Sequence, residues 1–168
     1  MHVQDIMTQN PTCCGPAATV QAAAKLMMEN DCGEIPVLDD NGIPIGVITD
    51  RDIACRCVAE GKTNDTRVSD VMSSPVVTVT PATSLADCCA VMEENQIRRV
   101  PVVDDAGKCC GMVSQADVAL GSDTEKTGQL VRDMSKPNHD TSHADCSLLW
   151  SQQDRYVAIT ILGRLNIE

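Results

Sequence analysis

The sequence predicts a mixed α/β fold, in which two tandem β-α-β-β-α repeats pack sheet to sheet about an approximate two-fold axis, followed by a C-terminal extension. The first supporting observation is an internal duplication. When the sequence is aligned with itself so that Met7 meets Met72, the match continues without a gap, and 36-PVLDDNG-42 falls on 101-PVVDDAG-107. The second is that each half has one helix-periodic stretch followed by two apolar runs around a glycine-containing turn. A single repeat of roughly 50 residues is too small to bury a stable core alone, so the halves are expected to pack together.

The first part of each repeat is expected to form a short strand and a helix. Runs typical of strands occur near Thr12–Cys13 and at 76-VVTV-79, and Pro16 and Pro81 follow them at positions suited to a helix start. Apolar residues then recur at the i, i+3, i+4 and i+7 spacing of one helix face. These residues are Val20, Ala23, Ala24 and Met27 in the first repeat, and Leu85, Cys88, Cys89 and Met92 in the second.

The second part of each repeat is expected to form a hairpin and another helix. The runs 35-IPVLDD-40 and 44-PIGVIT-49 are joined through Asn41-Gly42, and 100-VPVVDD-105 and 108-KCCGMVS-114 through Ala106-Gly107. The paired aspartates at these turns are interpreted as turn residues and not as a calcium site. Helices then open at 50-DRDIACRCV-58 and 115-QADVAL-120.

The expected division of the chain places the first repeat at residues 1–60, a polar linker at 61–67, the second repeat at 68–122, and a C-terminal helix and arm at 123–168. Within the arm, 155-RYVAITIL-162 is rich in β-branched residues. This run could be an extra sheet edge, an arm exchanged within a dimer, or a poorly ordered tail.

Composition and charge exclude several classes of partner. The formal net charge of −11 argues against binding to nucleic acid or to an anionic membrane. The chain has no Phe, one Trp and one Tyr, so it lacks the aromatic surface on which single-stranded bases stack. The N-terminus has no basic region followed by an apolar run, and no apolar stretch is long enough to span a bilayer. We therefore expect a cytoplasmic protein.

The sequence contains ten cysteines, which include three vicinal pairs and no CxxC spacing. Most lie in apolar runs, so they are expected to be free buried thiols, with a redox or metal role as the alternative. Metal-capable side chains occur at His139, His143, Asp145 and Cys146, but their spacing is irregular and we predict no metal site. These two histidines and His2 lie outside the repeats, so a Cys–His catalytic pair, and an enzyme, are not expected.

One motif occurs in both repeats, as 46-GVITDRD-52 and 111-GMVSQAD-117. A hydroxyl residue followed three positions later by an acid is typical of a capping box, which satisfies free N–H groups at a helix start. The same geometry can bind a ligand, because a helix N-terminus beside a strand end attracts anions and a carboxylate can accept ribose hydroxyls. The two interpretations do not exclude each other.

The duplicated unit, with 33-GEIPVLDDNGIPIGVITDRD-52 and 97-IRRVPVVDDAGKCCGMVSQAD-117, resembles a pair of CBS domains, the tandem arrangement called a Bateman module. The resemblance covers about residues 1–135. It implies a regulatory sensor, not a catalyst, whose ligand contains adenosine: AMP, ADP, ATP, S-adenosylmethionine or NAD. No obligatory cofactor is implied. A homodimer is expected, and an unknown protein could be regulated by it.

The resemblance also implies two clefts, each combining the motif of one repeat with segments of the other. The stronger site would comprise Thr49, Arg51, Asp52, Val77, Thr78, Ile97, Arg98, Arg99, Val100 and Pro101. The weaker site would comprise Ser114, Asp117, Thr12, Cys13, Ile35 and Pro36, with Cys32, Gly33 and Glu34 beside them. Gly33-Glu34 stand where the stronger site has two arginines, and a carboxylate repels phosphate. The weaker site is therefore expected to be empty, to bind weakly, or to take an adenosyl group with little negative charge.

Three functions follow as hypotheses. The first is a stand-alone regulatory module that binds an adenosine-containing ligand and changes its dimer geometry or its contact with a partner. The second is a structural dimerisation or interaction module whose pockets are vestigial. The third is a thiol-based redox responder.

Overall fold

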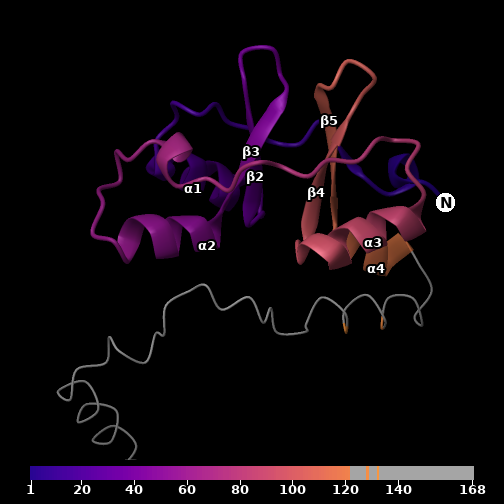
Figure 1. The fold of residues 1–168 in the computed structure, drawn as a ribbon. Coiled ribbons are helices and arrows are strands. Elements are labelled where there is room, and N and C mark those ends of the chain that lie inside the picture. The colour runs from indigo at the N-terminus through magenta and orange to yellow at the C-terminus, as the bar shows by residue number, and fades with distance from the viewer. Residues whose placement is uncertain (122–127, 129–131, 133–168) are drawn as a thin grey trace, which may run out of the picture. The chain divides into compact units, whose positions relative to one another are not determined.

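The computed structural model describes residues 1–121, together with Gly128 and Arg132 (Figure 1). The predicted C-terminal helix and arm, including the run at 155–162, therefore lie almost entirely outside the described residues. The expected mixed fold of two tandem β-α-β-β-α repeats is confirmed, and in Figure 1 each repeat has its own hairpin and its own pair of helices. No helix of the described part is long and apolar enough to cross a membrane.

The first long helix of each repeat begins later than its proline. These helices are α1, Val20–Glu29, and α3, Leu85–Asn95. Their first turns are capped by hydroxyl side chains, because Thr19 accepts from the Ala22 N–H at 3.1 Å and Ser84 accepts from the Asp87 N–H at 3.1 Å. The expected start at the prolines is therefore wrong by a few residues.

The prolines instead serve a contact between the repeats. The Pro16 carbonyl accepts from the Ser69 N–H at 3.0 Å, and the Pro81 carbonyl accepts from the Gln4 N–H at 3.1 Å. On α1, Val20, Ala23 and Met27 are buried as expected, whereas Ala24 is exposed. Leu26 is half-buried against the core in its place.

Each repeat has an antiparallel hairpin. In the first, β2, Glu34–Leu38, pairs with β3, Pro44–Thr49. In the second, β4, Arg99–Val103, pairs with β5, Cys109–Ser114. The predicted turn role of the aspartates is confirmed: Asp39 Oδ1 accepts from the Ile43 N–H at 2.8 Å, and Asp104 Oδ1 accepts from the Lys108 N–H at 2.9 Å.

The short run before each long helix adds a parallel bridge to the hairpin. Cys14 pairs with Val37 and Val79 pairs with Val102. The second helix of each repeat follows its hairpin directly. In the first repeat it is α2, Asp50–Asp52, continued by the wider π-helix η2, Ile53–Val58, and in the second it is α4, Gln115–Gly121.

The two repeats exchange their opening segments. The short 3-10 helix η1, Val3–Asp5, leads to β1, Thr8–Gln9, which pairs with β5 of the second repeat. The corresponding 3-10 helix η3, Val68–Asp70, leads to Ser73, which pairs with Val47 on β3 of the first repeat. Each hairpin therefore gains an edge from the other half of the chain.

The two cores show the same exchange. Val3 is fully buried in the core of the second repeat, whereas Val68 and Val71 are buried in the core of the first. Burial of these apolar side chains favours association of each opening segment with the opposite repeat. Separating the repeats would expose both.

The cysteines differ from expectation in their burial. All nine cysteines in the described part of the chain are free thiols. Only Cys57 and Cys88 among them are buried, whereas Cys55 is exposed and the others are half-buried. The expectation of buried thiols is therefore wrong for most of them, and several can be reached from solvent.

Candidate functional site

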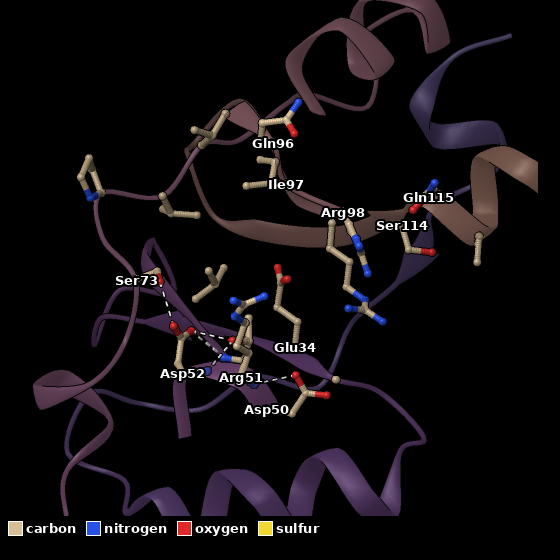
Figure 2. A pocket seen from close by; sticks show the side chains of 18 residues that line it. Glu34, Asp50, Arg51, Asp52, Ser73, Gln96, Ile97, Arg98, Ser114 and Gln115 are labelled. Atoms are coloured by element: carbon tan, nitrogen blue, oxygen red, sulfur yellow. Dashed lines mark hydrogen bonds between the residues drawn. The ribbon is translucent and has the colours of Figure 1, made fainter. Parts of the chain in front are cut away.

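A cleft of about 770 Å³ lies between the two repeats (Figure 2). Its wall is formed by the start of β2, the end of β3, the start of α2, the segment that follows η3, the loop that leads into β4, and the junction of β5 with α4. The lining residues are Gly33, Glu34, Val47, Thr49, Asp50, Arg51, Asp52, Ser73, Pro75, Val76, Val77, Gln96, Ile97, Arg98, Arg99, Ser114, Gln115 and Ala116.

Most residues expected in the stronger site line this cleft. They are Thr49, Arg51, Asp52, Val77, Ile97, Arg98 and Arg99. Three others do not line it: Val100 and Pro101 are buried in the middle of β4, and Thr78 is half-buried outside the wall. Alternation along a strand explains Val100, because it places that side chain on the face opposite Arg99, against the core.

Several lining residues were missed from the sequence. Ser73 reaches the cleft because its segment pairs with β3 of the other repeat, and Gln96 because it ends α3 in the left-handed conformation, with φ of 52°. The self-alignment places Ser73 at the same position as Thr8, which lines a second cleft, but the sequence alone assigned neither residue to a cleft.

The motif at 49–52 forms a complete capping box. The Thr49 hydroxyl donates to Asp52 Oδ2 at 2.8 Å and accepts from the Asp52 N–H at 2.9 Å, while the Thr49 N–H donates to the same Oδ2 at 3.0 Å. Ser114 and Asp117 make the same three hydrogen bonds, at 2.6, 3.2 and 2.7 Å. The capping interpretation is confirmed in both repeats, and it leaves Oδ1 of each aspartate for other partners.

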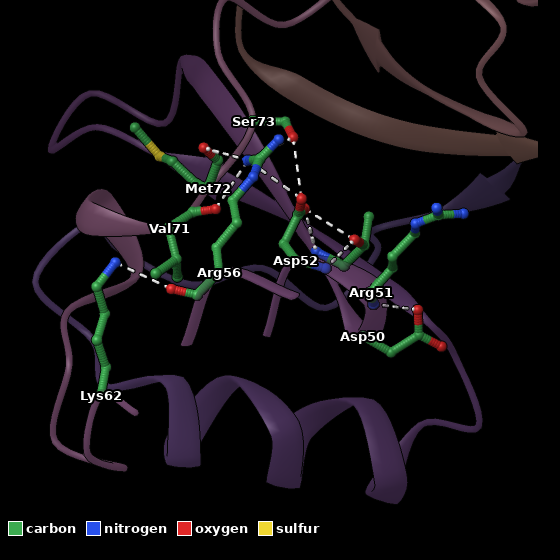
Figure 3. A network of polar contacts seen from close by, with 9 residues as sticks. Asp50, Arg51, Asp52, Arg56, Lys62, Val71, Met72 and Ser73 are labelled. Atoms are coloured by element: carbon green, nitrogen blue, oxygen red, sulfur yellow. Dashed lines mark hydrogen bonds and ion pairs between the residues drawn. The ribbon is translucent and has the colours of Figure 1, made fainter. Parts of the chain in front are cut away.

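Among the described residues, that oxygen takes part in an ion pair only in the first repeat (Figure 3). Asp52 Oδ1 lies 3.1 Å from Arg56 Nη1 and accepts from the Ser73 hydroxyl at 3.2 Å. Arg56 Nη1 also donates to the carbonyl oxygens of Val71 at 2.9 Å and Met72 at 3.0 Å. Arg56 therefore connects the motif at 49–52 to the segment at 71–73, which belongs to the second repeat and pairs with β3 of the first.

The second repeat has no arginine at the equivalent position. Gly121 stands at the matching position, and a Cβ atom there would lie 2.7 Å from Ile6 Cγ2. Asp117 consequently has no counterpart of the Arg56 ion pair within the part of the chain that the structure describes. The two motifs therefore share a backbone geometry but differ in electrostatics.

A second cleft of about 410 Å³ lies beside Ser114 and Asp117. Its lining residues are Thr8, Asn10, Pro11, Thr12, Asn30, Asp31, Cys32, Glu34, Arg99, Met112, Ser114, Ala116 and Asp117. Of the residues expected in the weaker site, Ile35 and Pro36 are buried in β2 and Cys13 lies outside the wall. Glu34 and Arg99 line both clefts, so the second cleft contains a cation that the sequence did not assign to it.

Glu34 is the strongly perturbed acid of the first cleft, and its side chain is labelled among the lining residues in Figure 2. Burial raises the pKa of its carboxyl from 4.5 to about 7, and the nearby carboxylates of Asp52 and Asp50 add to this rise. The Arg99 guanidinium acts in the opposite direction but does not outweigh burial. Near neutral pH the carboxyl is therefore divided between its neutral and charged forms.

No group of three or more His, Cys, Asp or Glu side chains suited to a metal ion occurs among the described residues. The metal-capable stretch at 139–146 lies outside them.

Comparison with known proteins identifies the family. The CBS domain model matches the chain twice, over residues 3–57 and 68–121. This chain belongs to the CBS-domain family. The CBS domain-containing protein YhcV of Bacillus subtilis (strain 168) is 39% identical over 137 residues, which make up 81% of this chain and 96% of YhcV.

Solved structures of other CBS pairs have the same fold. Hypoxic response protein I, whose crystal structure contains two coordinated zinc ions, matches with a TM-score of 0.68 and 34% identity over 73% of this chain and 100% of its own. CBSX2 in complex with AMP matches with 0.64 and 31%, over 71% and 94%. The CBS domain pair of MJ0100, in complex with 5′-methylthioadenosine and S-adenosyl-L-methionine, matches with 0.66 and 27%, over 71% and 98%.

The half-buried carboxyl of Glu34 predicts a pH-dependent stability. Between pH 4.5 and about 7 the folded chain holds a proton on Glu34 that the unfolded chain has lost, so the free energy of unfolding decreases as pH rises through this window. Glu34→Gln removes the free-energy cost of ionising this carboxyl in the folded chain. We expect the variant to be more stable than the wild type by on the order of 2 kcal/mol at pH 8, and nearly equal to it at pH 4.5.

Urea denaturation at both pH values measures this difference. Glu29→Gln, at the exposed end of α1, is the matched control and should change stability little at either pH. An effect of Glu34→Gln that is the same at pH 4.5 and pH 8 would contradict the assignment.

Proposed function

We propose that this CBS pair is a regulatory module that binds an adenosine-containing ligand in the larger cleft. The observation that carries the proposal is the meeting, in one cleft, of the Thr49–Asp52 motif from one repeat with Ile97 and Arg98 from the other. The AMP bound to CBSX2 and the S-adenosyl-L-methionine bound to MJ0100 support the choice of ligand class.

The cleft provides a partner for each part of such a ligand. Asp52 and Thr49 would receive the ribose hydroxyls, while Val47, Val77 and Ile97 would pack against adenine. The guanidinium groups of Arg51, Arg98 and Arg99 would bind phosphate oxygens. A volume of about 770 Å³ lies within the range of ordinary ligand sites.

The ribose contact would compete with contacts that the protein already makes. Asp52 Oδ1 is paired with Arg56 and Ser73, so a ribose hydroxyl must share or displace them. Because Ser73 belongs to the exchanged segment, ligand binding would change how one repeat holds the other. A ligand can regulate a protein only if it binds two states of that protein with different affinity. We propose that this response acts through a homodimer or an unidentified partner protein, and not through catalysis.

The second cleft is proposed to be the weaker one, with a preference for an adenosyl group that carries little negative charge. It lacks a counterpart of Arg98, because Gly33 occupies that place in the first repeat. Arg99 reaches it, but the Glu34 carboxyl does so as well. The net charge facing a phosphate is therefore less favourable there than in the first cleft.

A thermal-shift panel tests the proposal with AMP, ADP, ATP, S-adenosylmethionine and NAD. A ligand present at about 100 times its dissociation constant adds roughly 2.7 kcal/mol of stability, which raises Tm by about 5 °C or more. Arg98→Gln is the informative variant because Arg98 is exposed and its change leaves the capping network intact. For a phosphorylated ligand we expect its affinity to fall about tenfold or more.

Arg67→Gln is the matched control, since Arg67 is exposed and does not line the cleft. It removes the same charge from the chain and should leave the affinity unchanged. Absence of a shift with every ligand on folded protein would overturn the proposal and favour a structural interaction module.

A further inference from the structure

Two cysteines far apart in the sequence lie close together. Cys13 follows β1 and Cys109 begins β5, and a side-chain interaction between the two thiols shifts the pKa of each. The contact follows from the exchange of opening segments. Gln9 pairs with Gly111, and the Asn10 N–H donates to the Cys110 carbonyl at 3.1 Å, so the chain that leads to Cys13 runs beside the start of β5.

The vicinal cysteines on either side face elsewhere. Cys14 packs against the core of the first repeat, and Cys110 packs against the core of the second, where its thiol donates to the Val102 carbonyl at 3.5 Å. Neighbouring side chains in extended backbone point to opposite faces, which leaves Cys13 and Cys109 together. Both are half-buried, so a small oxidant can reach them.

The two thiols are not equivalent. The Cys13 thiol donates to the Pro11 carbonyl at 3.2 Å, and its interaction with the Cys109 sulfur lowers the pKa of Cys109 and raises that of Cys13. Burial raises the pKa of Cys14 to about 11, and burial also raises that of Cys110. Because the thiolate is the nucleophile, Cys109 is the member suited to first attack and Cys13 is placed to resolve the product.

We propose that Cys13 and Cys109 are a modification site, at which a peroxide oxidises the two thiols to a reversible disulfide. The Cys109 thiolate attacks one peroxide oxygen, the O–O bond breaks, and the leaving hydroxide takes a proton to become water. The resulting sulfenic acid is attacked by the Cys13 sulfur, the S–S bond forms, and the S–O bond breaks to release a second water. Two electrons pass from the thiols to the peroxide, and a dithiol reductant reverses the change.

The disulfide would join the opening segment of the first repeat, which contains β1 and Cys13, to β5 by a covalent bond. Residues Asn10, Pro11 and Thr12 precede Cys13 and line the second cleft, as do Met112 and Ser114 of β5. Oxidation would therefore restrain two walls of that cleft relative to each other. The proposal does not depend on ligand binding in the first cleft.

Peptide mapping of the full-length protein tests this site. The reduced protein is treated with hydrogen peroxide, alkylated, digested with trypsin and analysed by mass spectrometry without reduction. Cleavage after Lys25 and after Lys108 separates Cys13 and Cys14 from Cys109 and Cys110. We expect a linked pair of these peptides, lighter by two hydrogens than their sum, in monomeric protein, and its loss on treatment with dithiothreitol.

Four serine variants identify the sulfurs involved. The linked pair is expected to disappear in Cys13→Ser and in Cys109→Ser, and to persist in the matched controls Cys14→Ser and Cys110→Ser. Persistence of the link in Cys13→Ser or Cys109→Ser would overturn the proposal. So would a link found only between two chains, or peroxide treatment that leaves both peptides as separate alkylated or overoxidised species in folded wild-type protein.

Discussion

Gly46→Val is expected to lower the free energy of unfolding by about 3 kcal/mol or more, because it blocks the pairing of the exchanged segment with β3. A Cβ atom at this position would lie 2.8 Å from the Ser73 carbonyl oxygen and 2.9 Å from Met72 Sδ. The methionine side chain can move, but the carbonyl belongs to the backbone. That carbonyl accepts from the Val47 N–H at 3.0 Å, and the Ser73 N–H donates to the Val47 carbonyl at 2.9 Å. Relieving the clash therefore breaks both bonds.

Urea denaturation followed by circular dichroism measures the loss. Gly15→Val is the matched control, since a Cβ atom at Gly15 meets nothing within 4 Å, and it should change stability by less than about 0.5 kcal/mol. The loss of stability in Gly46→Ala should lie between those of Gly46→Val and Gly15→Val. A Gly46→Val protein as stable as the wild type would show that β3 does not need the exchanged segment.

Asp52→Ala is expected to destabilise the protein more than Asp117→Ala, although both remove the same capping box. Loss of the cap costs about 1 kcal/mol in each repeat. Only Asp52→Ala also leaves Arg56 and the Ser73 hydroxyl without their shared acceptor. The Arg56 side chain is 46% exposed, so water compensates for part of this loss. We expect a total of about 2–3 kcal/mol for Asp52→Ala and about 1 kcal/mol for Asp117→Ala.

A double-mutant cycle isolates the contribution of the Asp52–Arg56 ion pair to stability. Arg56→Met keeps much of the aliphatic side chain while removing the charge, and its effect should be smaller in the Asp52→Ala background than in the wild type. Equal destabilisation by Asp52→Ala and Asp117→Ala would show that the ion pair contributes nothing. The cycle also bears on ligand assays, because an Asp52 variant that is partly unfolded would lose binding for a structural reason.

The sequence by itself determined the elements of this CBS pair and their duplication. Helix periodicity, the turns at Asp39 and Asp104, and the capping boxes at Thr49 and Ser114 all depend on residues a few positions apart. Such local hydrogen bonds and apolar spacings can be recognised without knowing the tertiary structure. The family resemblance then predicted part of the larger cleft, because its motif and its arginines lie in the repeated segments and line the cleft.

Only the tertiary structure decided which segment pairs with which repeat. The self-alignment shows that Thr8 and Ser73 are equivalent, but it contains nothing to indicate that each pairs with the opposite hairpin. Three further features depend on parts of the chain that lie far apart or on the exchange of opening segments. They are the presence of Glu34 and Arg99 in both clefts, the ion pair of Arg56, and the proximity of Cys13 to Cys109. Contacts of this kind are selected by burial and packing across the whole fold, and a local sequence pattern carries no record of the distant partner.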